Sequence, residues 1–308
     1  MNKFLWLVRR ELWEARSVWV APAILAAIMV GGTLLGALLT GSASLEGLGP
    51  EDAAKLHEKM TPEHLDGVVS LALGFIFMVF LVLVLFTQFI YALDSLYGER
   101  RDRAILFWKS LPVSDLATVL SKLLVASVVM PLVATAFALA TQLAMFAVGG
   151  AKLASIDMLH GHLWTAPLWG GSILFMLYIS IAGMFWFLPV IGWCLLVSAW
   201  APRSPLMYAT LTPLGAALGE FLVFRTHYLG TIVGERVKLF GLLSQALGGH
   251  AINSVVIDDE HFNIPHSLLE TMRPLQFLSS PEVWGGVVVG ALLVAAAVWV
   301  RRSRDESA

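Results

Sequence analysis

The sequence predicts an all-α membrane protein, and three observations lead to this class. Hydrophobic residues make up 58% of the 308 residues, whereas charged residues make up only 14%. Soluble domains carry about 25% charged residues, so this chain has too few charges to cover a globular surface in water. Apolar runs of roughly 18 residues or more, which can cross the hydrocarbon core of a bilayer, recur along the chain. We therefore expect residues 1–308 to form a single transmembrane domain.

The first segment, residues 1–16, is predicted to be an amphipathic helix that lies in the membrane interface. Apolar side chains such as Phe4, Leu7 and Leu12 fall mostly on one side of this helix, and charged side chains such as Arg10 and Glu14 fall mostly on the other. A short helix with one apolar and one strongly charged face binds at the boundary between headgroups and acyl chains.

Six apolar runs follow, and we expect each of them to cross the membrane once. Pro131 in the third run and Pro189 in the fourth are expected to bend their helices, because proline lacks the N–H that the helix ladder needs. Ser114 or Asp115 can cap the helix that begins the third run. The six runs are 18–39, 68–93, 116–148, 166–199, 205–224 and 283–300.

The segment 225–282 separates the last two runs and is the longest stretch between them. Its middle part, 239–257, is moderately apolar but rich in glycine and interrupted by Gln245, His250 and Asn253. We interpret this part as short interfacial or re-entrant helices and not as a seventh span.

The distribution of Lys and Arg sets the expected orientation. Six spans place both ends of the chain on one membrane side. That side holds 13 of the 20 Lys and Arg residues, and the other side holds 7. Cytoplasmic loops are enriched in these residues, so both termini are predicted to be cytoplasmic and the segment 225–282 extracytoplasmic. A seventh span would turn Arg301 and Arg302 outward, against this rule.

Several functional classes are not indicated by any motif. No Gly-x-x-x-x-Gly-Lys-Ser/Thr sequence is present, so we predict that this chain binds no nucleotide, needs no cofactor and is not itself an ATPase or another enzyme. The net charge of −2 gives no indication of nucleic-acid binding. His160 and His162 are interpreted as solvated side chains and not as metal ligands. The single cysteine, Cys194, is expected to be a buried thiol.

Three polar side chains within the predicted spans are candidates for a translocation path. Gln88 and Gln142 lie in the second and third spans, where they either form hydrogen bonds between helices or line a path. Glu220 lies five residues before Arg225 near the end of the fifth span. It either pairs with Arg225 at the interface or contributes to a path, since an ionisable residue at membrane depth is a functional candidate.

The segment 94–118 and its continuation to Lys122 form a basic interruption between the second and third spans. A helix-forming stretch from Glu99 to Lys109 contains the apolar cluster 105–108, and Leu111-Pro112 is expected to end it, because a residue before proline avoids the α region. A loop that only reverses the chain direction does not need such an apolar cluster. We therefore predict that this segment lies on the membrane or in a groove of a soluble partner.

The same segment resembles the cytoplasmic loop of the ABC-2 type transporter permeases. Glu99, the Pro112-Val113-Ser114 triplet and Lys122 fall at the spacing of that family, while Arg103-Ala104 stands where the family has a Gly-Thr pair. The resemblance extends to the amphipathic N-terminus, the six spans and the large segment before the last span.

This resemblance implies the membrane subunit of an ATP-driven exporter in the bacterial inner membrane. Its partners would be a separate P-loop ATPase chain, a second identical or paralogous permease and the lipid bilayer, and the segment 94–118 would be the coupling loop. The alternative is an ATP-independent secondary transporter or another polytopic membrane protein. The residues that we predict to contact the ATPase are Glu99, Arg100, Arg101, Arg103, Phe107, Trp108 and Pro112.

Overall fold

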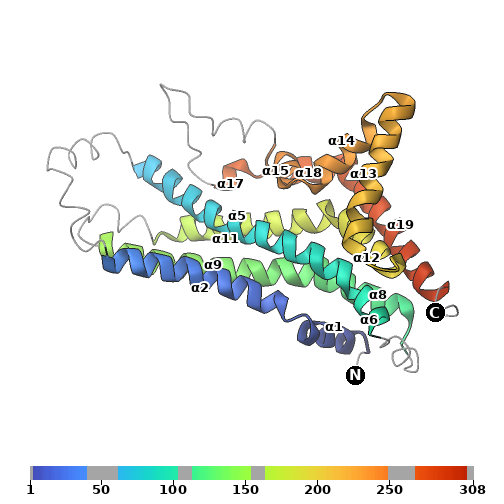
Figure 1. Ribbon diagram of the computed structural model, residues 1–308. Coiled ribbons are helices and arrows are strands. Elements are labelled where there is room, and N and C mark those ends of the chain that lie inside the picture. The colour runs from blue at the N-terminus through green and yellow to red at the C-terminus, as the bar shows by residue number, and fades with distance from the viewer. Residues whose placement is uncertain (1–2, 40–61, 103–112, 154–163, 249–267, 304–308) are drawn as a thin grey trace.

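The computed structural model describes residues 3–39, 62–102, 113–153, 164–248 and 268–303, and within these ranges it contains helices and turns but no strand (Figure 1). Six helical segments are long and apolar enough to cross a membrane, as predicted. They are α2 (Ser17–Leu39), α5 (Pro62–Ser95), the continuous run of α8 (Asp115–Leu124), η1 (Val125–Val129) and α9 (Met130–Leu153), α11 (Ala166–Trp186), α13 (Pro205–Phe224) and α19 (Pro281–Ser303).

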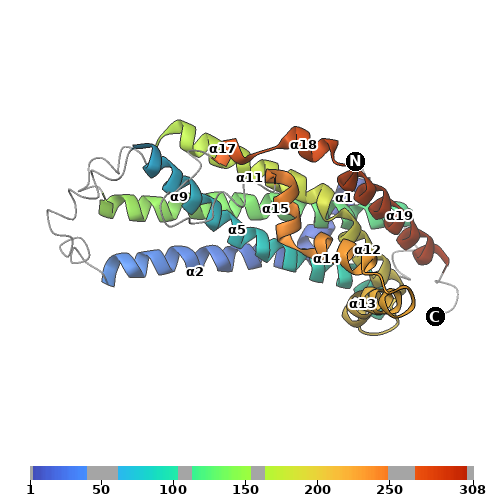
Figure 2. The same ribbon diagram turned by 90° about the horizontal axis from the view of Figure 1, so that it is seen from above.

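Four of these helices form an elongated bundle. Helices α2, α5, α9 and α11 run side by side, and α9 packs against α2, α5 and α11 (Figures 1 and 2). The two ends of the chain lie at the same end of this bundle. The short helix α1 (Lys3–Glu14) precedes α2 and packs against α8 at that end.

The third span begins as predicted, with Ser114 as the cap. The Oγ of Ser114 accepts a hydrogen bond from the Ala117 N–H at 3.2 Å. The expected distortion near Pro131 takes the form of the π-helical turn η1, which ends two residues before the proline.

The fourth predicted span consists of two helices. Helix α11 ends at Trp186, and α12 (Leu188–Trp200) begins after Phe187, so the break lies just before Pro189. Helix α12 then packs closely on α19. A Cβ atom added to Gly290 of α19 would lie 2.8 Å from Leu188 Cγ, which shows that only glycine allows this approach. Cys194 of α12 is buried, as predicted.

Short helices connect the fifth and sixth spans. They are α14 (Tyr228–Val237), α15 (Leu239–Leu247), α17 (Leu268–Thr271) and α18 (Pro274–Ser279). Helix α15 has nine residues, about half the length that a membrane crossing needs. It rests on α11, where the Tyr178 hydroxyl donates to the Ala246 carbonyl at 2.7 Å. Residues 249–257 of the predicted re-entrant segment lie outside the described residues.

The side chain of Arg236 connects α14 to the end of α11 and the start of α19. The guanidinium of Arg236 lies over the Trp186 ring, 4.1 Å from its centroid, and donates to the Glu282 carbonyl. Burial lowers the pKa of Arg236 from its usual value, but the group stays protonated at neutral pH. Arg236 therefore holds the start of α19 against the end of α11.

Candidate functional site

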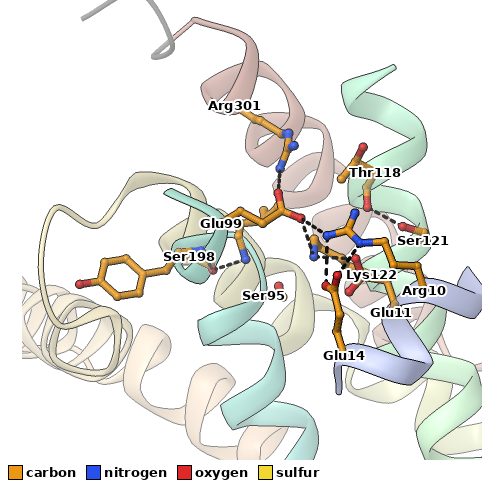
Figure 3. Close-up of polar contacts among 12 residues, drawn as sticks. Arg10, Glu11, Glu14, Ser95, Glu99, Thr118, Ser121, Lys122, Ser198 and Arg301 are labelled. Carbon is orange, nitrogen blue, oxygen red and sulfur yellow. Dashed lines mark hydrogen bonds and ion pairs between the residues drawn. The ribbon is translucent and has the colours of Figure 1, made fainter. Parts of the chain in front are cut away.

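Four charged side chains from four separate segments meet in the interior at the end where both termini lie (Figure 3). They are Glu11, Glu99, Lys122 and Arg301, which we call the charge node. Their exposed fractions are 3%, 8%, 2% and 6%. Charged residues are almost never buried to this extent unless they are paired, so the node is the most unusual polar feature in the described part of the chain.

Glu99 is the acid at the centre of the node. One of its carboxylate oxygens, Oε2, lies 2.7 Å from Nη1 of Arg301, and the other, Oε1, lies 3.0 Å from Nζ of Lys122. Lys122 Nζ also donates to Oε1 of Glu11 at 2.8 Å. The four side chains thus form one chain of ion pairs, Glu11–Lys122–Glu99–Arg301, with a formal charge of zero.

Further polar groups surround the node and contact its remaining oxygen and nitrogen atoms. The Tyr91 hydroxyl donates to Glu11 Oε2 at 2.9 Å. Asp115 accepts from Nε of Arg301 at 3.0 Å. Arg10 lies 3.7 Å from Glu99 and 2.6 Å from Glu14, at the solvent side.

Three of the helices bring their charges together because Glu11, Lys122 and Arg301 each continue a buried stripe of their own helix. On α19, the buried residues Gly290, Val294 and Ala297 are followed at helical spacing by Arg301. On α8, Val119 and Lys122 share the buried face, and on α1 Glu11 lies one turn after buried Leu7. Residues three or four apart lie on one face of a helix, so packing the apolar stripes also aligns the charges.

The position of Glu99 depends on a tight junction between α5 and α6 (Tyr97–Arg101). The Oγ of Ser198 on α12 accepts the backbone N–H groups of Leu96 and Tyr97 at 3.0 and 2.9 Å. The Arg100 guanidinium donates to the carbonyls of Ser198 and Ala201 at 2.8 and 2.7 Å. This junction is therefore fixed to α12 on one side and to the node on the other.

A polar cleft of about 630 Å³ lies beside the node, between α1 and the end of α5. Lys122 and Glu11 line it together with the more exposed Glu14, Asp94 and Arg101. The ion pairs of the node are thus close to water at one side and enclosed by helices on the others.

The structure distributes the predicted coupling residues over two environments. Glu99 and Arg100 face inward and bond to other parts of the chain. Arg101 is exposed and lies 3.1 Å from Asp102 and 3.9 Å from Asp94. The other four predicted residues, Arg103, Phe107, Trp108 and Pro112, lie outside the described residues.

The two predicted glutamines form hydrogen bonds between helices. Gln88 of α5 donates to the Ala126 carbonyl of η1 at 2.6 Å, and Gln142 of α9 donates to the Leu73 carbonyl of α5 at 2.8 Å. Both side chains are buried. These contacts correspond to the structural alternative for both residues, and a role in a translocation path stays a prediction.

Glu220 does not form the ion pair with Arg225 that was one of the two alternatives for this residue. Its carboxylate accepts from the Thr226 hydroxyl at 2.7 Å and from the N–H groups of Tyr228 and Leu229 at 2.8 and 2.7 Å. Arg225 instead ends α13 in the left-handed region, with φ 55°, and its guanidinium lies 5.8 Å from the centroid of the Phe221 ring. Glu220 therefore closes the turn between α13 and α14.

Sequence reasoning missed most of the charge node. In the sequence Arg301 indicates topology, Lys122 contributes to topology and to the motif spacing, and Glu11 is one of the charged residues of the predicted amphipathic segment 1–16. The available signal was the spacing of each charge, which continues an apolar stripe such as Val294, Ala297 and Arg301.

No group of three or more potential metal ligands occurs among the residues that the structure describes. Comparison of the chain with protein-family models, with curated proteins and with solved structures gave no match.

Proposed function

We propose that this chain is the membrane subunit of an ATP-driven transporter of the ABC type, in which a separate ATPase acts on the segment 94–118. The six apolar helices and the shared end of the two termini are compatible with such a subunit. The resemblance of Glu99, Pro112-Val113-Ser114 and Lys122 to the permease loop supports the same assignment. The export direction rests on that resemblance alone.

The observation that carries the proposal is the attachment of this segment to the charge node at both of its ends. Glu99 precedes residues 103–112 and pairs with Lys122 and Arg301. Asp115 follows them and also pairs with Arg301. A force applied to the segment by a partner therefore reaches α1, α8 and α19 through ion pairs.

In this proposal the node transmits movement, and the exposed residues bind the partner. Arg101 on the cleft side and the apolar residues Phe107 and Trp108 would contact the ATPase. Glu99 and Arg100 would keep the base of the segment rigid. The node end would be cytoplasmic, α1 would lie in the interface of the inner membrane, and a second copy or paralogue would complete the transporter.

The test uses the full-length chain with the P-loop ATPase that a neighbouring reading frame encodes. The two chains are co-expressed, purified together and placed in liposomes, and ATP hydrolysis is compared with that of the ATPase alone. Arg101→Glu combined with Trp108→Ala should reduce co-purification, because both changes alter the predicted contact surface. Arg301→Gln should leave co-purification intact and abolish stimulation of hydrolysis.

Arg302→Gln is the matched control, since Arg302 is the exposed neighbour of Arg301 on the same helical turn. It should retain both co-purification and stimulation. The proposal would be refuted if the ATPase never co-purified with the chain, or if the chain alone moved a substrate along an ion gradient without ATP. The second result would instead establish a secondary transporter.

A further inference from the structure

The third span contains a π-helical turn directly after α8, the helix that carries Lys122 of the charge node. This turn, η1 (Val125–Val129), separates α8 from α9, and Pro131 is the second residue of α9. A π-turn within an α-helix is rare and occurs frequently at functional sites. It therefore needs a physical cause in this chain, and Pro131 supplies one.

Proline removes the donor that two successive carbonyls would use. In a regular α-helix the Ser127 carbonyl would bond the N–H of residue 131, and in a π-helix the Ala126 carbonyl would do so. Pro131 has no N–H, so each of the two registers leaves one carbonyl without its donor. Neither register is fully satisfied by the third span itself.

The structure shows which register is adopted. The N–H of Met130 bonds the Val125 carbonyl, five residues earlier, and is thus not available to Ala126 as in an α-helix. The Ala126 carbonyl is the one that loses its donors. Its residue is fully buried, so solvent cannot replace them.

Gln88 of α5 supplies the missing donor. Its Nε2 lies 2.6 Å from the Ala126 carbonyl oxygen, and its side chain is 5% exposed. An unsatisfied buried carbonyl is costly in an apolar environment, so this one side chain favours the π register over the α register.

The two sides of η1 are held by different parts of the molecule. Before it, α8 contributes Lys122 and Asp115 to the charge node and its surroundings and packs on α1 and α19. After it, α9 packs on α2 and α5 within the bundle. A change of register in η1 would therefore move the node end relative to the bundle.

We propose that η1 is a two-register joint in the third span, that Pro131 makes both registers accessible, and that the Gln88 hydrogen bond to Ala126 holds the π register. Loss of that bond allows the hydrogen-bond register of the third span to shift by one residue. Such a change rotates α8 relative to α9 by about 100°, because an α-helix has 3.6 residues per turn. The rotation would carry Lys122 away from Glu11 and Glu99.

The joint itself does not depend on the proposed transporter function. Only its use, as the place where movement of the segment 94–118 reaches the bundle, rests on that function. The experiment therefore uses the chain without any ATPase, so that its failure and the failure of the proposed function give separate results.

The experiment measures the geometry of the third span directly. In a Cys194→Ala background, spin labels are attached at Leu116 of α8 and Leu132 of α9, which are 51% and 41% exposed. The labels are about 24 Å apart along the helix, at 1.5 Å per residue. Pulsed electron paramagnetic resonance spectroscopy then gives the distribution of distances between the two labels. It is measured in the reference chain and in the variants Gln88→Leu, Pro131→Ala and the double variant.

We expect one narrow distribution in the reference chain, held by Gln88. Gln88→Leu should broaden or shift it, because the Ala126 carbonyl loses its donor. Pro131→Ala restores an N–H that either register can use, and it also removes the proline ring that clashes with the carbonyl four residues earlier, so the ordinary α register becomes the more stable one. The distance distribution should therefore shift to that of the α register and should be the same in the single and in the double variant. If the Gln88→Leu chain does not fold, Pro131→Ala alone tests the joint by this shift, and rescue of folding in the double variant supports it.

Gln142→Leu is the matched control, because Gln142 is also a buried glutamine that donates to a neighbouring helix. It should leave the distance distribution unchanged, both in the reference chain and in the Pro131→Ala chain. The proposal is overturned if Gln88→Leu gives the reference distribution, if Pro131→Ala fails to shift it, or if Gln142→Leu has the same effect as Gln88→Leu.

Discussion

Two glutamates illustrate how differently two regions of this molecule are held together. Glu99 pairs with Arg301, which is 202 positions away in the sequence, and with Lys122. Glu220 bonds to groups six to nine positions away, in the turn that follows its own helix. One carboxylate connects the fold over long range, and the other closes a single hairpin.

The surroundings of the two glutamates differ in the same way. Around Glu99, the helices α1, α8, α12 and α19 pack on one another and leave the glutamate 8% exposed, beside the polar cleft. Around Glu220, α13 and α14 expose most of their apolar side chains, and only 6% of the most apolar stretch of α13 is buried. In a membrane protein an apolar helix that faces lipid is stable without further packing, because its backbone groups are satisfied within the helix. The long-range polar contacts around Glu99 therefore indicate which helices are held to one another.

The largest expected effect is that of Lys122→Leu. This change leaves Glu11 and Glu99 without their shared cation in a buried site, and breaking a buried ion pair on one side costs about 3–5 kcal/mol. We expect a large fall in the unfolding temperature of the detergent-purified chain. Lys238→Leu, which removes a cation with a side chain 60% exposed, is the control and should change that temperature little.

A double variant sharpens this prediction. Glu11→Leu together with Lys122→Leu removes one acid and one base and leaves Glu99 paired with Arg301. It should be less destabilised than Lys122→Leu alone, because no carboxylate then lacks a cation. Equal unfolding temperatures for Lys122→Leu and Lys238→Leu would show that the node contributes nothing to stability.

The six spans could be predicted from the sequence because a span is a local property. An apolar run of sufficient length predicts it without knowledge of its neighbours, and Pro189 correctly indicated the break in the fourth run. Hydropathy did not reveal which spans are packed. Helices α11 and α13 have similar mean hydropathies of 1.7 and 1.4, but 39% and 6% of their apolar stretches are buried.

The charge node could not be predicted in the same way because it depends on which helix ends meet. Glu99 was singled out from its loop, but its partners are known only once α8 and α19 are placed side by side. The π-turn was missed for a related reason. Pro131 indicated a disturbed helix, whereas the donor that stabilises the disturbance, Gln88, comes from another span.

An intermediate effect on stability is expected when either of two glycines is replaced by alanine. At Gly290 the new Cβ would lie 2.8 Å from Leu188 Cγ and 3.0 Å from the Pro189 nitrogen, so Gly290→Ala should cost about 1–3 kcal/mol through overpacking. At Gly215 of α13 nothing lies within 4 Å, so Gly215→Ala should stabilise the helix by up to about 1 kcal/mol. Unfolding temperatures should therefore move in opposite directions. A loss of stability at both positions would mean that α13 is packed against something that the single chain does not show.

The smallest effect, and the most local one, is expected for Glu220→Leu. The change removes the acceptor of the Tyr228 and Leu229 N–H groups at the start of α14, where the helix itself offers no acceptor. Hydrogen exchange of residues 226–229 should become faster, while exchange at the charge node and the global unfolding temperature stay unchanged. Asp66→Leu, at the far end of α5, serves as a control for loss of a carboxylate and should leave exchange at 226–229 as it was. If Glu220→Leu also accelerated exchange in α6 or α8, the α13–α14 turn and the charge node would be energetically linked, and the contrast between a long-range and a local glutamate would not hold.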